Sequence, residues 1–231
     1  MQKKSISIQE KRKLVAKLEP KSPITEQYRT IRTNIQFASV DKEIKSITVT
    51  SSGPAEGKST TIANLAVVFA QQGKKVLLID ADLRRPTAHY MLQLPNTIGL
   101  TNILTKQVSL KEAIRETDVE GLFAITSGPL PPNPAELLGS ASMEQLIKEV
   151  TDLFDIVLFD TPPLLAVTDA QVMADKTDGT ILVVSSGRTD REEAKKAKAL
   201  VESTKGKLLG AILNNKKQDK STHYYYYYGN S

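Results

Sequence analysis

The chain has 231 residues, 40% of them hydrophobic, which is enough to bury one substantial core but short for two full domains. The absence of cysteine excludes disulfides and thiolate metal sites, and the presence of only two histidines argues against a zinc site. No apolar run reaches the roughly 18 residues that span a bilayer, and the N-terminus lacks the apolar stretch of a secretory signal. We therefore expect a soluble, cytoplasmic protein.

The net charge of +5 is concentrated at the N-terminus. Residues 1–21 carry seven cationic and two anionic side chains, so the rest of the chain is formally neutral. Such a basic arm suits an anionic lipid surface or an acidic partner segment, and a solvated flexible arm is an equally good interpretation. Nucleic-acid binding is disfavoured, because neither aromatic platforms nor a recognition helix accompany the basic residues. We divide the chain into a basic N-terminal arm (1–21), a globular domain (22–215) and a flexible tail (216–231).

The predicted elements begin at Ser22 and Pro23, which supply a helix N-cap and a first-turn proline. Apolar residues from Ile24 to Ile35 recur at helical spacing, so an amphipathic helix precedes the core. Strands are then predicted over 46–51, 75–80, 122–126, 155–160, 180–186 and 208–214, and helical segments over 58–72, 86–117, 135–150, 169–175 and 190–205. The strands are unbroken apolar runs, as in a parallel sheet with both faces covered. This alternation predicts a three-layer α/β fold with a mostly parallel central sheet.

A phosphate-binding loop lies between the first predicted strand and the helix that follows it. In the sequence SGPAEGKST, Gly57, Lys58 and Ser59 have the arrangement of a P-loop, although Ser52 stands where the first glycine is usual. Backbone N–H groups of such a loop face phosphate oxygens, Lys58 bridges the β- and γ-phosphates, and Ser59 ligates Mg²⁺. The sequence therefore predicts a P-loop NTPase-like fold that binds ATP. The predicted ATP-binding loop residues are Gly53, Pro54, Ala55, Glu56, Gly57, Lys58, Ser59 and Thr60.

Acidic residues end two other predicted strands. The segment VLLIDADLR delivers Asp80, Asp82 and Arg84 to the carboxyl edge of the sheet, where ligands of open α/β sheets bind. Two carboxylates at this spacing can hold Mg²⁺ and accept a proton from a hydroxyl nucleophile, whereas the alternative is that one of them caps the next helix. Asp160 ends the strand DIVLFD and fits the acid that orients Mg²⁺ in P-loop proteins, although a strand-end Asp is also an ordinary turn residue.

The last predicted strand ends in two asparagines. Asn214 or Asn215 is placed to hydrogen-bond an adenine ring, and the alternative is again an ordinary turn residue. Together the loop, the acids and the asparagine form a consistent nucleotide–magnesium site.

These motifs in combination resemble one family. The segments GPAEGKST, VLLIDADLR, LFDTPP, SGPLPPNPAELL and EQYRTIR, with the run of five tyrosines near the C-terminus, are similar to those of bacterial protein-tyrosine kinases (BY-kinases) of the capsule and exopolysaccharide type. The resemblance runs from about residue 20 to the end of the chain. It is closest to the Firmicute members, in which the kinase is a separate chain activated by the cytoplasmic tail of a membrane protein.

The resemblance implies a P-loop kinase domain that uses ATP and Mg²⁺ to phosphorylate tyrosines of its own tail in trans. It also implies other protein substrates, such as sugar-nucleotide dehydrogenases, and a role in regulating capsular or exopolysaccharide biosynthesis. The activator would recruit the kinase to the inner face of the cell membrane, and unphosphorylated subunits would form a ring.

The resemblance also assigns family roles to individual residues. Catalytic roles fall on Lys58, Asp80 and Asp82, and metal-binding roles on Ser59, Asp80, Asp82 and Asp160. The autophosphorylated cluster is Tyr224, Tyr225, Tyr226, Tyr227 and Tyr228. The oligomerisation motif falls on Glu26, Arg29 and Arg32, whose spacing places them along one side of a helix, and the alternative is a solvated helix face.

The alternative function is that of a partition- or division-site ATPase, which acts as a nucleotide-dependent dimerisation switch. Those proteins carry a second lysine in the P-loop, five positions before the first, and that position here is Gly53. The missing lysine and the tyrosine cluster both favour the kinase.

Overall fold

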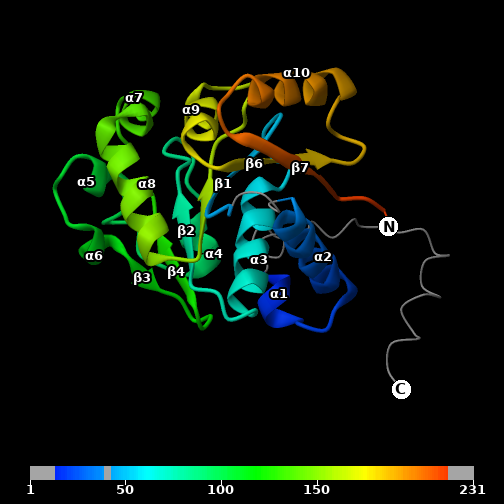
Figure 1. Ribbon diagram of the computed structural model, residues 1–231, viewed down its shortest axis with the longest axis horizontal. Coiled ribbons are helices and arrows are strands. Elements are labelled where there is room, and N and C mark those ends of the chain that lie inside the picture. The colour runs from blue at the N-terminus through cyan, green and yellow to red at the C-terminus, as the bar shows by residue number, and fades with distance from the viewer. Residues whose placement is uncertain (1–13, 39–42, 218–231) are drawn as a thin grey trace, which may run out of the picture.

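The computed structural model describes residues 14–38 and 43–217, with helices on both faces of a central sheet (Figure 1). Within that part of the chain the sheet has seven strands in the order β3-β4-β2-β5-β1-β6-β7. The strands are β1 (Ser46–Ser51), β2 (Val76–Asp80), β3 (Arg115–Glu116), β4 (Leu122–Ile125), β5 (Ile156–Asp160), β6 (Gly179–Ser185) and β7 (Lys207–Asn214). Neighbouring strands are parallel except β3 and β4, which are antiparallel. The predicted α/β fold with a mostly parallel sheet is confirmed.

Helices cover the two faces of the sheet as separate layers. They are α1 (Val15–Leu18), α2 (Pro23–Phe37), α3 (Lys58–Ala70), α4 (Ala88–Leu92), α5 (Leu100–Leu104), α6 (Leu110–Ala113), α7 (Pro134–Gly139), α8 (Ala141–Leu153), α9 (Asp169–Lys176) and α10 (Arg191–Glu202). Helices α1 to α4 share one hydrophobic cluster with one sheet face, and α5 to α8 share a second cluster with the other. A third cluster joins α9 and α10 to β6. Among the described helices, none is long and apolar enough to cross a bilayer.

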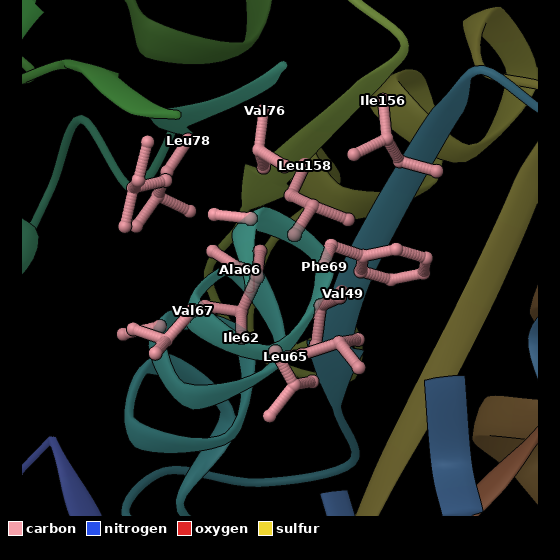
Figure 2. Packing of buried hydrophobic residues seen from close by; sticks show 14 of the residues in the cluster. Val49, Ile62, Leu65, Ala66, Val67, Phe69, Val76, Leu78, Ile156 and Leu158 are labelled. Carbon is pink, nitrogen blue, oxygen red and sulfur yellow. The ribbon is translucent and has the colours of Figure 1, made fainter. Parts of the chain in front are cut away.

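Successive residues of the inner strands alternate between the two clusters. Val76 and Leu78 of β2 pack with α3, whereas Leu77 and Ile79 belong to the cluster on the opposite face. Figure 2 shows the apolar side chains of α3, among them Phe69, gathered against those of β1, β2 and β5. Because α2 covers its other side, α3 is buried almost all round. The helix that follows the P-loop is therefore held firmly from two sides.

The start of α2 is as predicted. Ser22 is its N-cap, and the Oγ atom accepts the N–H of Thr25 at 3.2 Å. The prediction of helical structure through 86–117 is only partly correct, because the segment holds three short helices and strand β3. The chain does not continue as one helix at Gly99, because its backbone there is extended (φ −167°, ψ −153°). A Cβ atom at this position would lie 2.2 Å from the carbonyl oxygen of Thr126, so the close approach requires glycine.

The described end of the predicted basic arm packs on the domain. Ala16 in α1 is fully buried, and its N–H donates to Oδ1 of Asn64 in α3 at 2.9 Å. Leu14 and Ala16 are therefore packed on the domain, whereas residues 18–21 are exposed. Residues 1–13 lie outside the described part of the chain.

Candidate active site

The P-loop connects β1 to α3 at the carboxyl edge of the sheet. Gly57 is the N-cap of α3 and has a φ of 95°, a left-handed conformation that glycine adopts without strain. Asn214, the last residue of β7, donates from Nδ2 to the carbonyl oxygen of Glu56 at 2.9 Å. Pro54 and Ala55 form the exposed tip of the loop. The end of β7 is thus hydrogen-bonded to the P-loop. The contact of Asn214 with adenine stays a prediction.

Glu56 closes the loop from inside. It is 3% exposed, and its carboxylate accepts the N–H groups of Ser52 and Gly53, each at 3.2 Å. Ser52 has no positive φ, so this position of the loop does not require glycine. Serine therefore replaces the usual glycine without backbone strain. Thr60 lies half-buried in the first turn of α3.

Lys58 brings together three segments that are distant in sequence. Its Nζ atom lies 3.1 Å from Oδ2 of Asp82, 3.3 Å from Oδ1 of Asp160 and 3.2 Å from Oγ of Ser59. Burial disfavours the charge of Lys58, but the carboxylates of Asp160 and Asp82 outweigh it and hold the pKa of the ammonium group above its ordinary value. A fully charged lysine therefore stands between two acids beside the P-loop.

Asp80 lies at the edge of the sheet where it was predicted, and it also hydrogen-bonds the start of the next helix, as the alternative interpretation had it. It is fully buried, and its Oδ2 atom accepts the N–H groups of Thr87 at 3.0 Å and Ala88 at 2.9 Å, at the start of α4. Asp80 is also the register partner of Asp160 on the neighbouring strand. Burial and the nearby Asp160 carboxylate raise the pKa of Asp80 to about 7. Near neutral pH this carboxyl group is therefore partly protonated.

Asp160 and Ser59 fit a nucleotide-bound Mg²⁺. The Oδ2 atom of Asp160 is buried and has no hydrogen-bond partner among the described residues, and Nζ of Lys58 lies near both Oδ1 of Asp160 and Oγ of Ser59. Burial raises the pKa of Asp160, an effect that Lys58 opposes. Within residues 14–38 and 43–217, no group of three or more acidic or histidine side chains could hold a metal alone. A nucleotide-bound Mg²⁺ takes most of its ligands from phosphates and waters.

Asp169 is a buried neighbour of the site that the sequence did not indicate. Its two carboxylate oxygens accept hydrogen bonds from Arg84, which follows the acidic pair of the β2 loop. The sequence offered one indication of this contact, namely Arg84, because an arginine at the ligand-binding edge of a sheet needs an acidic partner. Since 85 residues separate the pair, no spacing rule identifies the partner.

The residues of the predicted oligomerisation motif lie on α2. Arg29 forms an ion pair with Glu26 in the same helix, and Arg32 donates from Nη1 to the carbonyl oxygen of Val68 in α3 at 2.7 Å. Their role in assembly stays a prediction. The tyrosine cluster at 224–228 lies outside the described residues.

Comparisons with known proteins point to one family. Residues 44–189 match the AAA domain family. The chain is 58% identical over 205 residues to the tyrosine-protein kinase YwqD of Bacillus subtilis (strain 168), a match that covers 89% of this chain and 86% of that protein. It is 46% identical over 195 residues to the putative tyrosine-protein kinase CapB of Staphylococcus aureus, covering 84% of this chain and 86% of CapB.

The structural comparison agrees with the sequence matches. The crystal structure of the chimerical protein CapA2B2 matches with a TM-score of 0.86 and 44% sequence identity, over 89% of this chain and 90% of that one. The resemblance inferred from the motifs and the predicted tyrosine-kinase activity are both confirmed, and nucleotide binding follows from the P-loop family. The chain belongs to the bacterial protein-tyrosine kinases.

Proposed function

We propose that the chain transfers the γ-phosphoryl group of ATP to tyrosines 224–228 in the tail of a neighbouring subunit and, less often, to tyrosines of other proteins. Sugar-nucleotide dehydrogenases are the expected class of separate substrate, and the outcome is regulation of capsular or exopolysaccharide biosynthesis. One observation carries the proposal: the ammonium group of Lys58 lies within 3.3 Å of carboxylate oxygens from both Asp82 and Asp160, next to a P-loop. One cation and two acids beside phosphate-binding N–H groups are the parts that phosphoryl transfer needs.

Each part has a proposed task in the reaction. The tyrosine hydroxyl oxygen forms the new bond to the γ-phosphorus, the bond from that phosphorus to ADP breaks, and Asp82 accepts the hydroxyl proton. Lys58 counters negative charge on the transferred group, while backbone N–H groups of the loop hold the other phosphates. Ser59, Asp80, Asp82 and Asp160 are the residues proposed to hold Mg²⁺ directly or through water. When bound, Mg²⁺ neutralises charge on the phosphate oxygens.

Partners follow from the family resemblance. The proposed activator is the cytoplasmic tail of a membrane protein, which would place the kinase at the inner face of the cell membrane. Subunits with unmodified tails are proposed to form a closed ring through Glu26, Arg29 and Arg32 on α2. The long matches to YwqD and CapB, each over 86% of that protein, support a kinase chain of similar extent.

Transfer between subunits can be tested by mixing two variants. One variant carries Lys58→Met and keeps its tail tyrosines, and the other keeps Lys58 but has phenylalanine at all five tail positions. With ATP and Mg²⁺, we expect phosphotyrosine on the Lys58→Met tail only in the mixture, because neither variant alone has both an active site and an acceptor. Mass spectrometry identifies the modified tyrosines, with and without candidate activator peptides.

The same assay distinguishes the alternative function. A nucleotide-dependent dimerisation switch would release phosphate from ATP and leave no phosphotyrosine on either tail. The wild-type chain alone is the positive control. Phosphotyrosine on the wild-type tail but never on the mixed Lys58→Met tail would show that transfer occurs within one subunit.

A further inference from the structure

Arg84 and Asp169 form a two-pronged ion pair beside the proposed active site. Nε of Arg84 lies 2.9 Å from Oδ2 of Asp169, and Nη2 lies 3.0 Å from Oδ1. The side chain of Asp169 is fully buried, whereas that of Arg84 is 42% exposed. This fork geometry fixes the direction of the arginine side chain as well as its distance, which a lysine could not do.

The ion pair connects the two segments that carry the acids of the site. Arg84 lies in the loop after β2, two residues beyond Asp82, and Asp169 is the first residue of α9, which follows β5 and Asp160. Strands β2 and β5 are neighbours in the sheet, but the loop after β2 and the chain from β5 to α9 are different segments. The pair is therefore a cross-link above the edge of the sheet. A buried ion pair adds little net stability on average, so its geometric effect is the better explanation of its presence.

The backbone next to Arg84 holds Asp82 in place. Oδ1 of Asp82 accepts the N–H of Arg84 at 3.4 Å and the N–H of Arg85 at 3.0 Å. The other oxygen, Oδ2, is left to face Nζ of Lys58 at 3.1 Å. Movement of the backbone at Arg84 and Arg85 would thus disturb the N–H groups that orient the carboxylate of Asp82 toward Lys58.

We propose that Asp169 is a positioning residue for phosphoryl transfer. Through its ion pair with Arg84 it holds the loop after β2, so that Asp82 presents one oxygen to Lys58 and to the reacting groups. The inference rests on the role proposed above for Asp82. Asp169 acts at a distance, so its loss should impair the steps that need an oriented Asp82. Binding of nucleotide without Mg²⁺ depends on the P-loop and should be unaffected.

The test uses the full chain and a set of matched variants. Asp169→Asn removes the negative charge and one of the two oxygen acceptors. Arg84→Lys keeps the positive charge but removes the two parallel N–H donors of the guanidinium group. Asp82→Asn is the reference for loss of the acid, and Asp169→Asn/Asp82→Asn tests whether the two act together. Asp175→Asn is the control, because Asp175 lies on the same helix but pairs with Lys205 at the surface. The readouts are tyrosine phosphorylation with ATP and Mg²⁺, ADP affinity with and without Mg²⁺, and thermal stability.

We expect Asp169→Asn and Arg84→Lys each to lower the phosphorylation rate about 10- to 100-fold, the usual effect of losing a residue that orients a ligand. ADP affinity without Mg²⁺ should change less than about 2-fold, and Mg²⁺ should strengthen ADP binding less than in the wild type. In the Asp82→Asn background, adding Asp169→Asn should reduce the rate no further than about 2-fold, because residues that act through one another are not additive. Asp175→Asn should match the wild type.

Two outcomes overturn the inference alone. One is a wild-type rate in Asp169→Asn while Asp82→Asn is impaired; the other is a double variant whose rate loss is the product of the two single losses. A thermal shift in Asp169→Asn without any change in rate or in the effect of Mg²⁺ would show a purely structural role. A wild-type rate in Asp82→Asn would overturn the proposed function of that acid and this inference with it.

Discussion

The ammonium group of Lys58 lies 3.1 Å from Oδ2 of Asp82, although 24 residues separate the two in the chain. The side chains are 11% and 6% exposed, so water competes little for either charge. A phosphate group that binds Lys58 must therefore weaken this pair.

We predict that Lys58→Met keeps the fold but lowers tyrosine phosphorylation by at least roughly 100- to 1,000-fold, the loss typical for one positioned donor. Methionine fills a similar space, and the backbone N–H groups of the loop remain. The rate is measured with ATP and Mg²⁺, and the fold is checked by circular dichroism. Lys195→Met is the matched control, because Lys195 pairs with Glu192 at the surface. A rate near that of the wild type would contradict the assignment of the site.

The second prediction concerns pH. Since the pKa of Asp80 is raised from 3.8 to about 7, the folded protein binds this proton more tightly than the unfolded chain does. The resulting stability is complete at low pH and is lost as the pH rises toward 7. Asp80→Asn does not titrate, so its free energy of unfolding should rise relative to that of the wild type between about pH 4 and about pH 7 and stay constant above that range.

Urea denaturation in the presence of EDTA measures this difference, because the chelator removes metal that would bind Asp80. Asp152→Asn serves as control, since Asp152 is an exposed acid on α8. The control should keep a constant difference from the wild type over the same pH range. A constant difference for Asp80→Asn as well would mean that the native environment of Asp80 does not raise its pKa.

The sequence was sufficient to predict that Lys58, Asp80, Asp82 and Asp160 lie close together at one edge of the sheet. Asp80 and Asp160 each end an apolar strand, and Lys58 opens the helix that follows the first strand. Parallel strands bring such positions to one edge of the sheet. Strand boundaries were close for the same reason, because buried strands are short apolar runs between turn residues. Local patterns therefore identify both the sheet and the residues at its carboxyl edge.

The contacts between distant segments were not predictable from the sequence. Asp169 pairs with Arg84 across 85 residues, and Asn214 reaches the P-loop across 158. Neither contact has a characteristic spacing. The packing of Ala16 on α3 was missed because four residues of helix give too little periodicity to detect.

The third prediction concerns Gly57 in the P-loop, and it distinguishes the effect of close contact with Asn214 from the effect of backbone strain. A Cβ atom at Gly57 would lie 2.0 Å from Nδ2 of Asn214, and the residue has a φ of 95°. Gly73 also has a positive φ, of 84°, but a Cβ atom there would have no atom of the described residues within 4 Å to oppose it. We expect Gly57→Ala to lose nucleotide binding and Gly73→Ala to lose only some stability, roughly 1 kcal/mol.

Calorimetric titration with ADP measures the first effect and thermal unfolding the second. In Gly57→Ala/Asn214→Ala the close contact is removed and the strain remains, so nucleotide affinity should recover in part. Equal nucleotide affinity in Gly57→Ala and Gly73→Ala would show that contact with Asn214 does not shape the loop.

The last prediction concerns the two arginines of α2, which the family resemblance treats alike but the structure does not. Arg32 donates to the carbonyl oxygen of Val68 at 2.7 Å, so Arg32→Ala should lower the free energy of unfolding by about 1.5–3 kcal/mol. Arg29 pairs with Glu26 on the surface, so Arg29→Ala should lower it by less than about 1 kcal/mol. Urea denaturation of both variants measures the difference. Arg29→Ala is therefore the cleaner test of assembly.

Light scattering of the wild type, Arg29→Ala and a variant with phenylalanine at 224–228 then tests the proposed ring, each before and after incubation with ATP and Mg²⁺. We expect Arg29→Ala to be smaller than the wild type and poor at self-phosphorylation, because it cannot present its tail to a neighbour. Each phosphotyrosine adds about −1.5 to −2 charges, so a modified tail should be repelled by Asp82 and Asp160 of the next subunit. The wild type should therefore dissociate after phosphorylation, while the phenylalanine variant stays assembled. An Arg29→Ala variant as large as the wild type, or a phosphorylated wild type that stays assembled, would refute the ring and its release.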